Sequence, residues 1–245
     1  MRLFGLIGYP LTHSFSKKYF TEKFDKENIT DARYELFELK DISEFPEVLK
    51  NNPDLCGLNV TIPYKEAIIP YLDELDEPVK NINAVNVIKV EKGKILKGYN
   101  SDYYGFKVSL LKLIQKVDPR YKSLILGSGG ASKAVCAALD DLGIPYLTVS
   151  RKADKGITYS DIDESLIRDY QIIINTTPLG MYPKTDSCPD IPYNFLTSDH
   201  YLFDLVYNPE ETLFMQRGKA AGAQTKNGLE MLYLQAEKAW EIWNS

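Results

Sequence analysis

The stretch Ser123-Leu-Ile-Leu-Gly-Ser-Gly-Gly-Ala-Ser-Lys133 decides the fold of the second half of this 245-residue chain. A short apolar run, Ser123–Leu126, leads into a glycine-rich turn and then into an alanine-rich segment that predicts a helix up to Leu142. Residues 146–149 predict a second strand, which completes a strand–helix–strand unit. Glycines at such a turn let backbone N–H groups approach a pyrophosphate at the positive end of the helix. The pattern predicts dinucleotide binding, with a purely structural turn as the alternative.

The turn itself supplies the residues expected to contact the pyrophosphate. They are Gly127, Ser128, Gly129, Gly130 and Ala131. Ser132 stands where such turns usually have a third glycine, and its side chain is small enough for close helix packing.

Cationic side chains follow the second strand of this unit. A unit that binds NAD places an Asp or Glu there, about 20 residues after the glycines, to hold the ribose hydroxyls. This chain has Ser150, Arg151 and Lys152 instead, with Lys155 just beyond. Cations at that position favour a site for the 2′-phosphate of NADP over a solvated loop whose charges bind nothing.

Two further predicted strands end near the same crevice. Residues 172–175 predict a third strand, and Thr176 and Thr177 lie at its tip. Residues 201–206 predict its neighbour, which ends at Val206 before Tyr207. Because parallel strands in open α/β sheets bind ligands at their carboxyl ends, both tips are expected to face the cofactor.

The first hundred residues alternate short apolar runs with amphipathic ones. Strands are expected at residues 3–7, 34–39 and 55–60, and helices at 16–27 and around 45–49. Residues 85–90 and 94–98 then predict a hairpin. Strand and helix in alternation imply an α/β fold with a mainly parallel sheet covered by helices.

The segment Asn59-Val-Thr-Ile-Pro-Tyr-Lys-Glu66 ends the predicted strand at residues 55–60. Pro63 cannot continue the ladder, so the polar groups of Asn59, Thr61 and Lys65 are expected at the strand tip, before a short helix. A lysine there suits proton transfer or a phosphate anchor. The alternative is a solvated lysine at a helix start, because lysines are mostly exposed.

A boundary between two domains is expected near Asp102. Ser101 and Asp102 immediately precede a predicted helix at residues 103–117, and either side chain is placed to cap it. Strand–helix alternation begins afresh after this helix. The last predicted helix, at residues 229–243, is apolar enough to require a docking surface, while Gln235 points along its edge.

Composition excludes several classes of function. The formal net charge is −5 without a basic block, which argues against nucleic acid and anionic membranes as partners. The three cysteines, Cys56, Cys136 and Cys188, have no metal-ligand spacing, and the two histidines, His13 and His200, lie in no zinc or catalytic-triad signature. We therefore expect no metal site. The thiols are expected to be free in a reducing cytoplasm, and the apolar start of the chain is too short for a signal peptide.

Eight segments in the same order resemble the shikimate dehydrogenase family over nearly the whole chain. They are Gly8-Tyr-Pro-Leu-Thr-His-Ser-Phe-Ser16, Asn59-Val-Thr-Ile-Pro-Tyr-Lys65, Ala84-Val-Asn86, Gly98-Tyr-Asn-Ser-Asp102, Gly127-Ser-Gly-Gly-Ala-Ser-Lys133, Asn175-Thr-Thr-Pro-Leu-Gly-Met181, Asp204-Leu-Val-Tyr-Asn-Pro209 and Gly228-Leu-Glu-Met-Leu-Tyr-Leu-Gln235. The resemblance implies a two-domain enzyme that reduces 3-dehydroshikimate reversibly with NADPH in aromatic amino-acid (chorismate) biosynthesis. It implies a substrate domain at residues 1–101 plus 229–245 and a Rossmann-type NADP-binding domain at residues 102–228, flanking a cleft.

The resemblance also assigns roles to individual residues. Ser14 and Ser16 match residues that bind the substrate carboxylate. The residues matching those around the ring hydroxyls are Asn59, Thr61, Asn86 and Gln235. Tyr207 matches a tyrosine that lines the substrate near the nicotinamide, and Gly228 matches a glycine whose backbone meets that ring.

Lys65 and Asp102 match the catalytic pair. Hydride transfer to a carbonyl leaves an alkoxide, so a nearby group must supply a proton, and the reverse reaction needs the same group as a base. We expect the two side chains to approach hydrogen-bonding distance. Which of them holds the proton stays open.

The chain departs from the family pattern after Ser16. The family usually has Pro next and His-Asn three residues further on, whereas this chain has Lys17, Phe20 and Thr21. Loss of the proline predicts a less rigid helix start. Lys17 adds a positive charge near the proposed carboxylate site. Ser101 stands where the family commonly has Thr and keeps the hydroxyl.

Two rival functions remain. A quinate or cyclitol dehydrogenase that uses NAD would be favoured by an acidic residue in place of Ser150 or Arg151, and this chain has none. A sensor without catalysis would need neither Lys65 nor Asp102, and both are present. The sequence leaves open whether the protein is a monomer or a homodimer.

Overall fold

The computed structural model describes residues 1–12, 14–91, 93–152 and 156–245, and it divides the chain into two compact units. Unit 1 comprises Met1–Ser101 and Ala236–Ser245, and unit 2 comprises Asp102–Gln235. The first boundary lies between Ser101 and Asp102. The second lies inside the last helix, seven residues beyond the expected start of the returning segment at Leu229, because that helix packs in both units.

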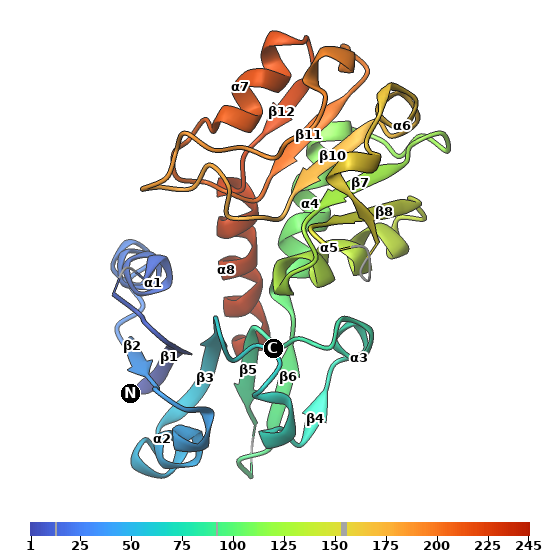
Figure 1. The fold of residues 1–245 in the computed structure, drawn as a ribbon. Helices are drawn as coiled ribbons and strands as arrows, with labels where there is room; N and C mark the ends of the chain where they lie inside the picture. The colour runs from blue at the N-terminus through green and yellow to red at the C-terminus, as the bar shows by residue number, and fades with distance from the viewer. Residues whose placement is uncertain (13, 92, 153–155) are drawn as a thin grey trace. The chain divides into compact units, whose positions relative to one another are not determined.

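Unit 1 is built on a mixed six-stranded sheet (Figure 1) with the order β2-β1-β3-β5-β6-β4. Its strands are β1 (Arg2–Gly8), β2 (Ala32–Glu38), β3 (Leu55–Val60), β4 (Glu74–Leu75), β5 (Val87–Val90) and β6 (Leu96–Tyr99). Strand β1 pairs in parallel with β2 and β3, and β4 pairs in parallel with β6. The expected hairpin is formed by β5 and β6, and β5 is also antiparallel to β3.

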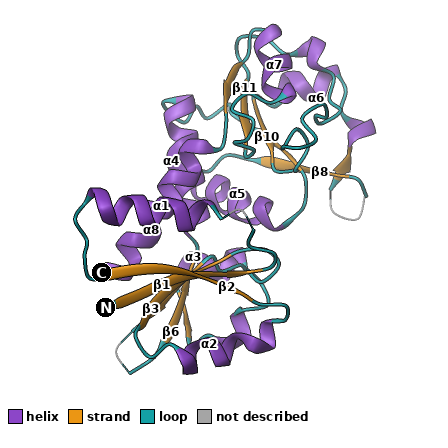
Figure 2. Ribbon diagram, turned by 90° about the vertical axis from the view of Figure 1, so that its left-hand side faces the viewer, coloured by secondary structure: helices purple, strands orange, loops and turns teal. Residues whose placement is uncertain are grey.

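Helices cover both faces of this sheet (Figure 2). Helix α1 (Phe15–Lys26) and the end of α8 (Leu229–Asn244) pack on one face around Phe4, Phe20 and Trp243. Helix α2 (Phe45–Asn51) packs on the other face with Leu3, Leu58 and their neighbours. The short helix α3 (Glu77–Ile82) precedes the hairpin.

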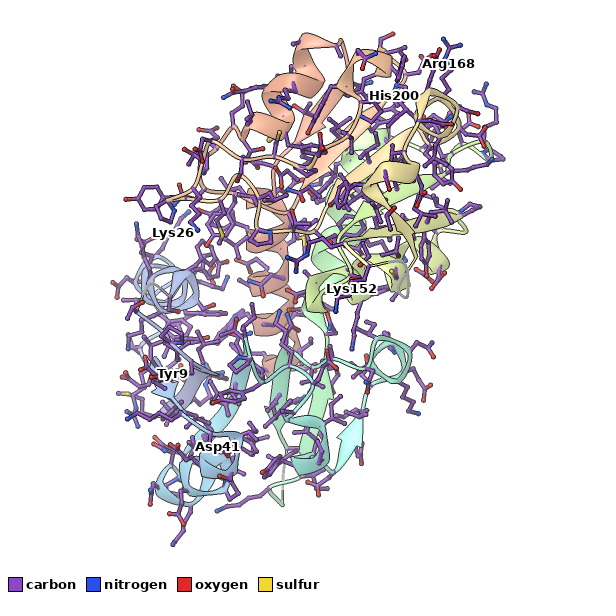
Figure 3. The ribbon with its side chains drawn as sticks, viewed as in Figure 1. Tyr9, Lys26, Asp41, Lys152, Arg168 and His200 are labelled. Carbon is purple, nitrogen blue, oxygen red and sulfur yellow. The ribbon has the colours of Figure 1, made fainter. Side chains whose placement is uncertain are left out.

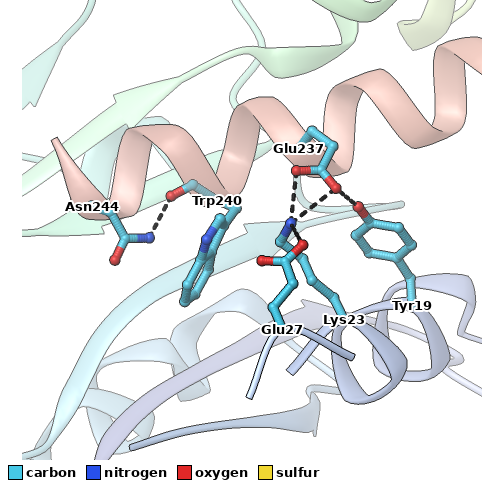
Figure 4. Close-up of polar contacts among 6 residues, drawn as sticks. All are labelled: Tyr19, Lys23, Glu27, Glu237, Trp240 and Asn244. Atoms are coloured by element: carbon cyan, nitrogen blue, oxygen red, sulfur yellow. Dashed lines mark hydrogen bonds and ion pairs between the residues drawn. The ribbon is translucent and has the colours of Figure 1, made fainter. Parts of the chain in front are cut away.

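The C-terminal part of α8 is tied to α1 by an ionic cluster as well as by aromatic packing (Figure 4). The ammonium Nζ of Lys23 lies 3.0 and 2.9 Å from the two carboxylate oxygens of Glu237 and 2.7 Å from Glu27. The hydroxyl of Tyr19 also donates to Glu237. These contacts provide the docking surface that the apolar last helix requires.

The sheet of unit 2 is parallel throughout, with the order β12-β11-β10-β7-β8-β9. Its strands are β7 (Ser123–Leu126), β8 (Tyr146–Ser150), β9 (Ile157–Thr158), β10 (Ile172–Asn175), β11 (Tyr201–Asp204) and β12 (Gln224–Lys226). Numbered from β7, the order is 3-2-1-4-5-6, which is that of a Rossmann fold. The order reverses between β7 and β10, so the glycine-rich turn after β7 lies at the expected ligand crevice.

Helices flank both faces of this second sheet. Helices α4 (Ser101–Ile114) and α5 (Gly130–Asp141) pack with Phe106, Val135 and Phe203. Helices α6 (Glu164–Asp169) and α7 (Leu213–Ala220) pack on the opposite face with Ile167 and Phe214. None of the helices in the described part of the chain has the length and apolar composition needed to cross a membrane.

Two local predictions were wrong. No short helix follows Pro63: the chain makes successive turns there, and a single 3₁₀ helix, η2 (Ile69–Tyr71), comes later. Tyr64 causes this arrangement by pointing into the core, where its hydroxyl donates to Leu39 O at 2.7 Å. Ser101 and Asp102 do not cap α4 from outside, because the helix begins at Ser101 and both residues lie in its first turn.

Candidate functional site

In unit 1, polar side chains gather at the end of β3 and at the end of the segment that precedes β5. The carbonyl oxygen of Asn86 accepts from Val60 N at 2.9 Å and from the side-chain amide of Asn59 at 3.4 Å. The side chain of Asn86 turns the other way, where its Oδ1 accepts from Ser101 N at 2.6 Å and its Nδ2 donates to Ser101 Oγ at 3.1 Å. The structure therefore brings Asn59 and Asn86 together, as their expected roles require.

The two serines expected to bind the substrate carboxylate lie at the start of α1. Ser14 is the N-cap, and its hydroxyl oxygen accepts from Lys17 N at 3.2 Å. Ser16 lies in the first turn, and its hydroxyl lies near that of Tyr34 on β2, whose pKa it acts to lower. Backbone N–H groups and hydroxyls at the positive end of a helix suit an anion such as a carboxylate.

Tyr34 is a site residue that the sequence did not reveal. Its hydroxyl donates to Asn59 Oδ1 at 2.7 Å, which ties β2 to the end of β3. Burial raises the pKa of Tyr34 far above its ordinary value, although the nearby Ser16 hydroxyl opposes that shift. In the sequence, Tyr34 looks like any aromatic residue in a strand, so no sequence signal distinguished it from an ordinary core residue.

Lys65 lies on a turn whose backbone is fixed at several points. Thr61 N donates to Ile7 O, Tyr64 N donates to Thr61 O, and Val85 N donates to Lys65 O, all within 2.9 Å. The Lys65 side chain is half-buried and Thr61 is also partly exposed. No helix begins at this lysine, so the helix-start part of the alternative is wrong.

Each of the three departures from the family pattern has a local explanation. The ammonium of Lys17 donates to the backbone oxygen of Tyr34 and pairs with Glu35 at 2.7 Å, so its charge is compensated on β2. Phe20 is fully buried and stacks on Tyr34 with ring centroids 4.7 Å apart. Thr21 Oγ1 bonds back to Lys17 O at 2.8 Å within α1. The tie between Lys17 and β2 fixes the helix start that the missing proline was expected to loosen.

In unit 2, the glycine-rich turn is shaped as a nucleotide site requires. Gly127 has φ +114°, a conformation that favours glycine, and a Cβ there would lie 2.7 Å from Thr176 Oγ1. By contrast, a Cβ at Gly129 or Gly130 would meet nothing within 4 Å, so the backbone at the start of α5 is open to a ligand. This open backbone at the N-terminus of a 12-residue helix fits a pyrophosphate.

The expected phosphate site follows β8. The hydroxyl of Ser150 lies 3.2 Å from that of Ser128 and accepts from Lys152 N at 3.3 Å, so it links the glycine-rich turn to the cationic turn. Arg151 and Lys152 are exposed, and both can therefore reach a phosphate. Lys152 is labelled in Figure 3. Lys155, the third expected cation, lies outside the described residues.

A buried network joins the tips of β10 and β11. Asp204 is fully buried and accepts from Asn175 Nδ2 at 2.9 Å, Val206 N at 3.0 Å and Thr212 Oγ1 at 2.5 Å. Asn175 Oδ1 in turn accepts from the backbone and hydroxyl of Thr177. Burial raises the pKa of Asp204 to about 6, against the effect of its three donors. This network sets the positions of the expected cofactor residues Thr177 and Val206.

The remaining candidates of unit 2 are Gly228, Gln235, Tyr207 and Asp102. Gly228 N donates to Val206 O at 3.1 Å, and a Cβ at Gly228 would lie 2.1 Å from Leu205 O, so only glycine fits there. Gln235 is buried and its amide donates to Leu232 O at 2.9 Å. Tyr207 is exposed, and Asp102 is partly exposed in the first turn of α4.

His200 has a structural role. Its Nδ1 accepts from Thr197 N at 3.0 Å, so Nε2 carries the proton and donates to Ile167 O at 3.0 Å. The ring is buried at the end of unit 2 opposite Lys152 (Figure 3). Among the residues that the structure describes, no group of three or more His, Cys, Asp or Glu side chains could hold a metal ion.

Comparisons with known proteins agree with this architecture. A family model described as the shikimate dehydrogenase substrate binding domain matches residues 6–88. The shikimate dehydrogenase (NADP(+)) of Clostridium beijerinckii is 42% identical over 99% of this chain and 92% of its own length.

Two solved structures are also similar. Shikimate 5-dehydrogenase of Thermus thermophilus, in complex with NADP(H) and shikimate, matches with a TM-score of 0.85 and 28% identity over 99% of this chain and 93% of that one. Quinate dehydrogenase of Corynebacterium glutamicum, in complex with NAD, matches with a TM-score of 0.89 and 25% identity over 99% of this chain and 93% of that one. The identity and coverage of the Clostridium relative settle the family: this chain belongs to the shikimate dehydrogenases.

Proposed function

We propose that this protein catalyses the reversible reduction of 3-dehydroshikimate to shikimate with NADPH, a step of aromatic amino-acid biosynthesis in the cytoplasm. The observation that carries the proposal is the hydrogen-bonded polar chain of unit 1 from Tyr34 through Asn59 to Asn86, with Ser16 beside Tyr34. It joins donors suited to a carboxylate with amides suited to ring hydroxyls in one site. Such a site fits a small polyhydroxylated acid.

In this proposal, unit 1 binds and orients the substrate. Ser14 and Ser16 hold the carboxylate at the positive end of α1, and Asn59, Thr61 and Asn86 hold the ring hydroxyls. Gln235 and Tyr207 complete the contacts. Hydroxyls and amides bind a carboxylate less strongly than cations do, which suits a product that must be released.

Lys65 and Asp102 transfer the proton. Reduction of the carbonyl leaves an alkoxide oxygen, and one member of the pair protonates it, whereas oxidation of the alcohol requires the same group as a base. The fixed backbone of the turn holds the half-buried Lys65 in place. A positioned acid or base of this kind contributes roughly 10²- to 10⁴-fold to the rate.

Unit 2 holds NADP, which supplies or accepts the hydride. The open backbone at Gly129 and Gly130 supports binding of the pyrophosphate by the turn from Gly127 to Ala131. Ser150, Arg151 and Lys152, together with Lys155, bind the 2′-phosphate. The nicotinamide side of the cofactor site is lined by Thr176, Thr177, Val206 and Gly228.

A second candidate is oxidation of quinate with NAD. The similarity to a quinate dehydrogenase in complex with NAD favours it. Against it, the residues after β8 are cationic, and a carboxylate is expected there when the ribose hydroxyls are free.

One assay tests the proposal. The purified protein is mixed with shikimate or quinate and with NADP or NAD, and the absorbance of the reduced nicotinamide is followed. We expect the highest kcat/KM for shikimate with NADP. More efficient turnover of quinate with NAD would replace the proposal with the second candidate, and absence of turnover with every pair would indicate a ligand-binding protein without catalysis.

A further inference from the structure

We infer that Tyr34 is a positioning residue of the substrate site: its buried hydroxyl sets the orientation of the Asn59 amide. The inference rests on the proposed function, because it concerns the site that binds shikimate there. It adds a residue to which neither the sequence nor the family motifs gave a role.

The direction of the hydrogen bond follows from the chemistry of its two partners. A phenol has one proton, and Tyr34 OH donates it to Asn59 Oδ1 at 2.7 Å, an amide oxygen that can only accept. Tyr34 is 2% exposed and Asn59 is 6% exposed, so water does not replace either partner. A buried polar group that loses its partner costs about 1–3 kcal/mol, which makes this arrangement strongly preferred.

This hydrogen bond fixes which end of the Asn59 amide, oxygen or nitrogen, faces Tyr34. With Oδ1 held by Tyr34, the amide nitrogen faces the other way, and one of its hydrogens is directed to Asn86 O at 3.4 Å. The second hydrogen of the same nitrogen is then what Asn59 can offer to a ligand. Asn59 therefore acts as a donor, and the substrate hydroxyl that it contacts must accept.

The Tyr34 ring is held from several sides, so the hydroxyl cannot swing away. Phe20 stacks on it at 4.7 Å with an interplanar angle of 14°, and the Trp243 ring lies 6.3 Å away. Lys17 anchors the backbone oxygen of the same residue and pairs with Glu35. Lys17 and Phe20, two of the departures from the family pattern, thus both contact Tyr34.

The first test is Tyr34→Phe, which keeps the stacked ring and removes only the hydroxyl. We expect the KM for shikimate to rise about tenfold, as the loss of one buried partner implies, with kcat within about threefold of wild type and the KM for NADP unchanged. Tyr193→Phe is the matched control, because that hydroxyl donates to Pro189 O at 2.8 Å within unit 2. An unchanged KM for shikimate in Tyr34→Phe would overturn the inference.

A double-mutant cycle separates positioning from a general loss of stability. If Tyr34 acts through Asn59, Tyr34→Phe should change KM little in an Asn59→Ala background, whereas two independent roles would give multiplicative effects on KM. Multiplicative effects would contradict the inference. Thermal unfolding of each variant, measured alongside, shows whether the fold persists.

Asn59→Asp gives a second, independent readout. The carboxylate keeps an acceptor for Tyr34 but removes the amide donor, so KM should rise about as much as in Asn59→Ala. A KM near that of wild type would show that Asn59 does not act as a donor and would overturn the inference. Failure of wild type itself to turn over shikimate would contradict the proposed function, which is a different result from normal turnover with unaffected variants.

Discussion

Gly57 on β3 lies directly beneath the indole ring of Trp243 on α8. A Cβ atom at Gly57 would lie 2.3 Å from both Cδ1 and Nε1 of that ring, and the same Nε1 donates to Ile88 O at 3.0 Å. The missing side chain lets the last helix reach the sheet of unit 1. The docking of α8 therefore depends on a glycine within a strand, where glycine is otherwise unfavourable.

Gly57→Ala should destabilise the protein by about 1–3 kcal/mol, because the added methyl group overpacks the contact with Trp243. Urea unfolding gives the difference in free energy. In a Trp243→Leu background, the smaller side chain leaves room for the methyl group, and the cost of Gly57→Ala should shrink. An equal cost in both backgrounds would contradict this packing account.

Lys23→Ala should lower the free energy of unfolding by about 1–2 kcal/mol, since the buried Lys23 loses hydrogen bonds to two charged but half-exposed carboxylates. Burial alone lowers the pKa of Lys23, but its bonds to Glu27 and Glu237 outweigh burial and raise that pKa. Lys18→Ala is the control, because Lys18 forms an exposed pair with Glu22 at 3.8 Å and should change stability by less than about 0.5 kcal/mol. Equal effects of the two variants would argue against the cluster.

The raised pKa of Asp204 predicts that the stability of the fold depends on pH. A carboxyl whose folded pKa is raised stabilises the fold fully below its unfolded pKa of 3.8, and that contribution is lost as the pH rises through about 6. Relative to Asp204→Asn, wild type should lose on the order of 3 kcal/mol of unfolding free energy between pH 4 and 7. Parallel stability profiles of the two proteins over this range would contradict the prediction.

Arg151→Ala should change the choice of cofactor. Loss of one charged hydrogen bond to the 2′-phosphate should lower kcat/KM for NADP by about 10- to 100-fold and leave kcat/KM for NAD nearly unchanged. Arg120→Ala is the control, because that exposed arginine pairs with Asp118 at 2.8 Å before β7, away from the strand tips. Equal losses with NADP and NAD would mean that Arg151 does not contact the 2′-phosphate.

Much of the fold was predictable because its signals are local. The bounds of β3, β7 and β10 agree with the predicted strands residue by residue, since each is a short apolar run that ends at a turn-forming or polar residue. The glycine-rich turn was recognisable for the same reason, because its glycines stand between an apolar run and a predicted helix. The structure adds that Gly127 has a positive φ.

The site was less predictable, because its geometry depends on contacts between distant segments. The turn after Pro63 differs from the predicted helix because Tyr64 lies in the core, where its hydroxyl donates to the backbone oxygen of Leu39, 25 positions away. Lys17 was expected to add charge at the carboxylate site, yet Glu35 on a neighbouring strand compensates it. Tyr34 gained a role only through its hydrogen bond to Asn59, which no spacing in the sequence encodes.

The central claim is that Lys65 and Asp102 transfer the proton, and turnover of Lys65→Ala tests it most directly. The rate of NADP reduction is measured with saturating shikimate for Lys65→Ala and for Lys80→Ala, an exposed control in α3 of the same unit. We predict a fall in kcat of at least about 100-fold for Lys65→Ala and none for the control. A kcat for Lys65→Ala within a few-fold of wild type would contradict the account.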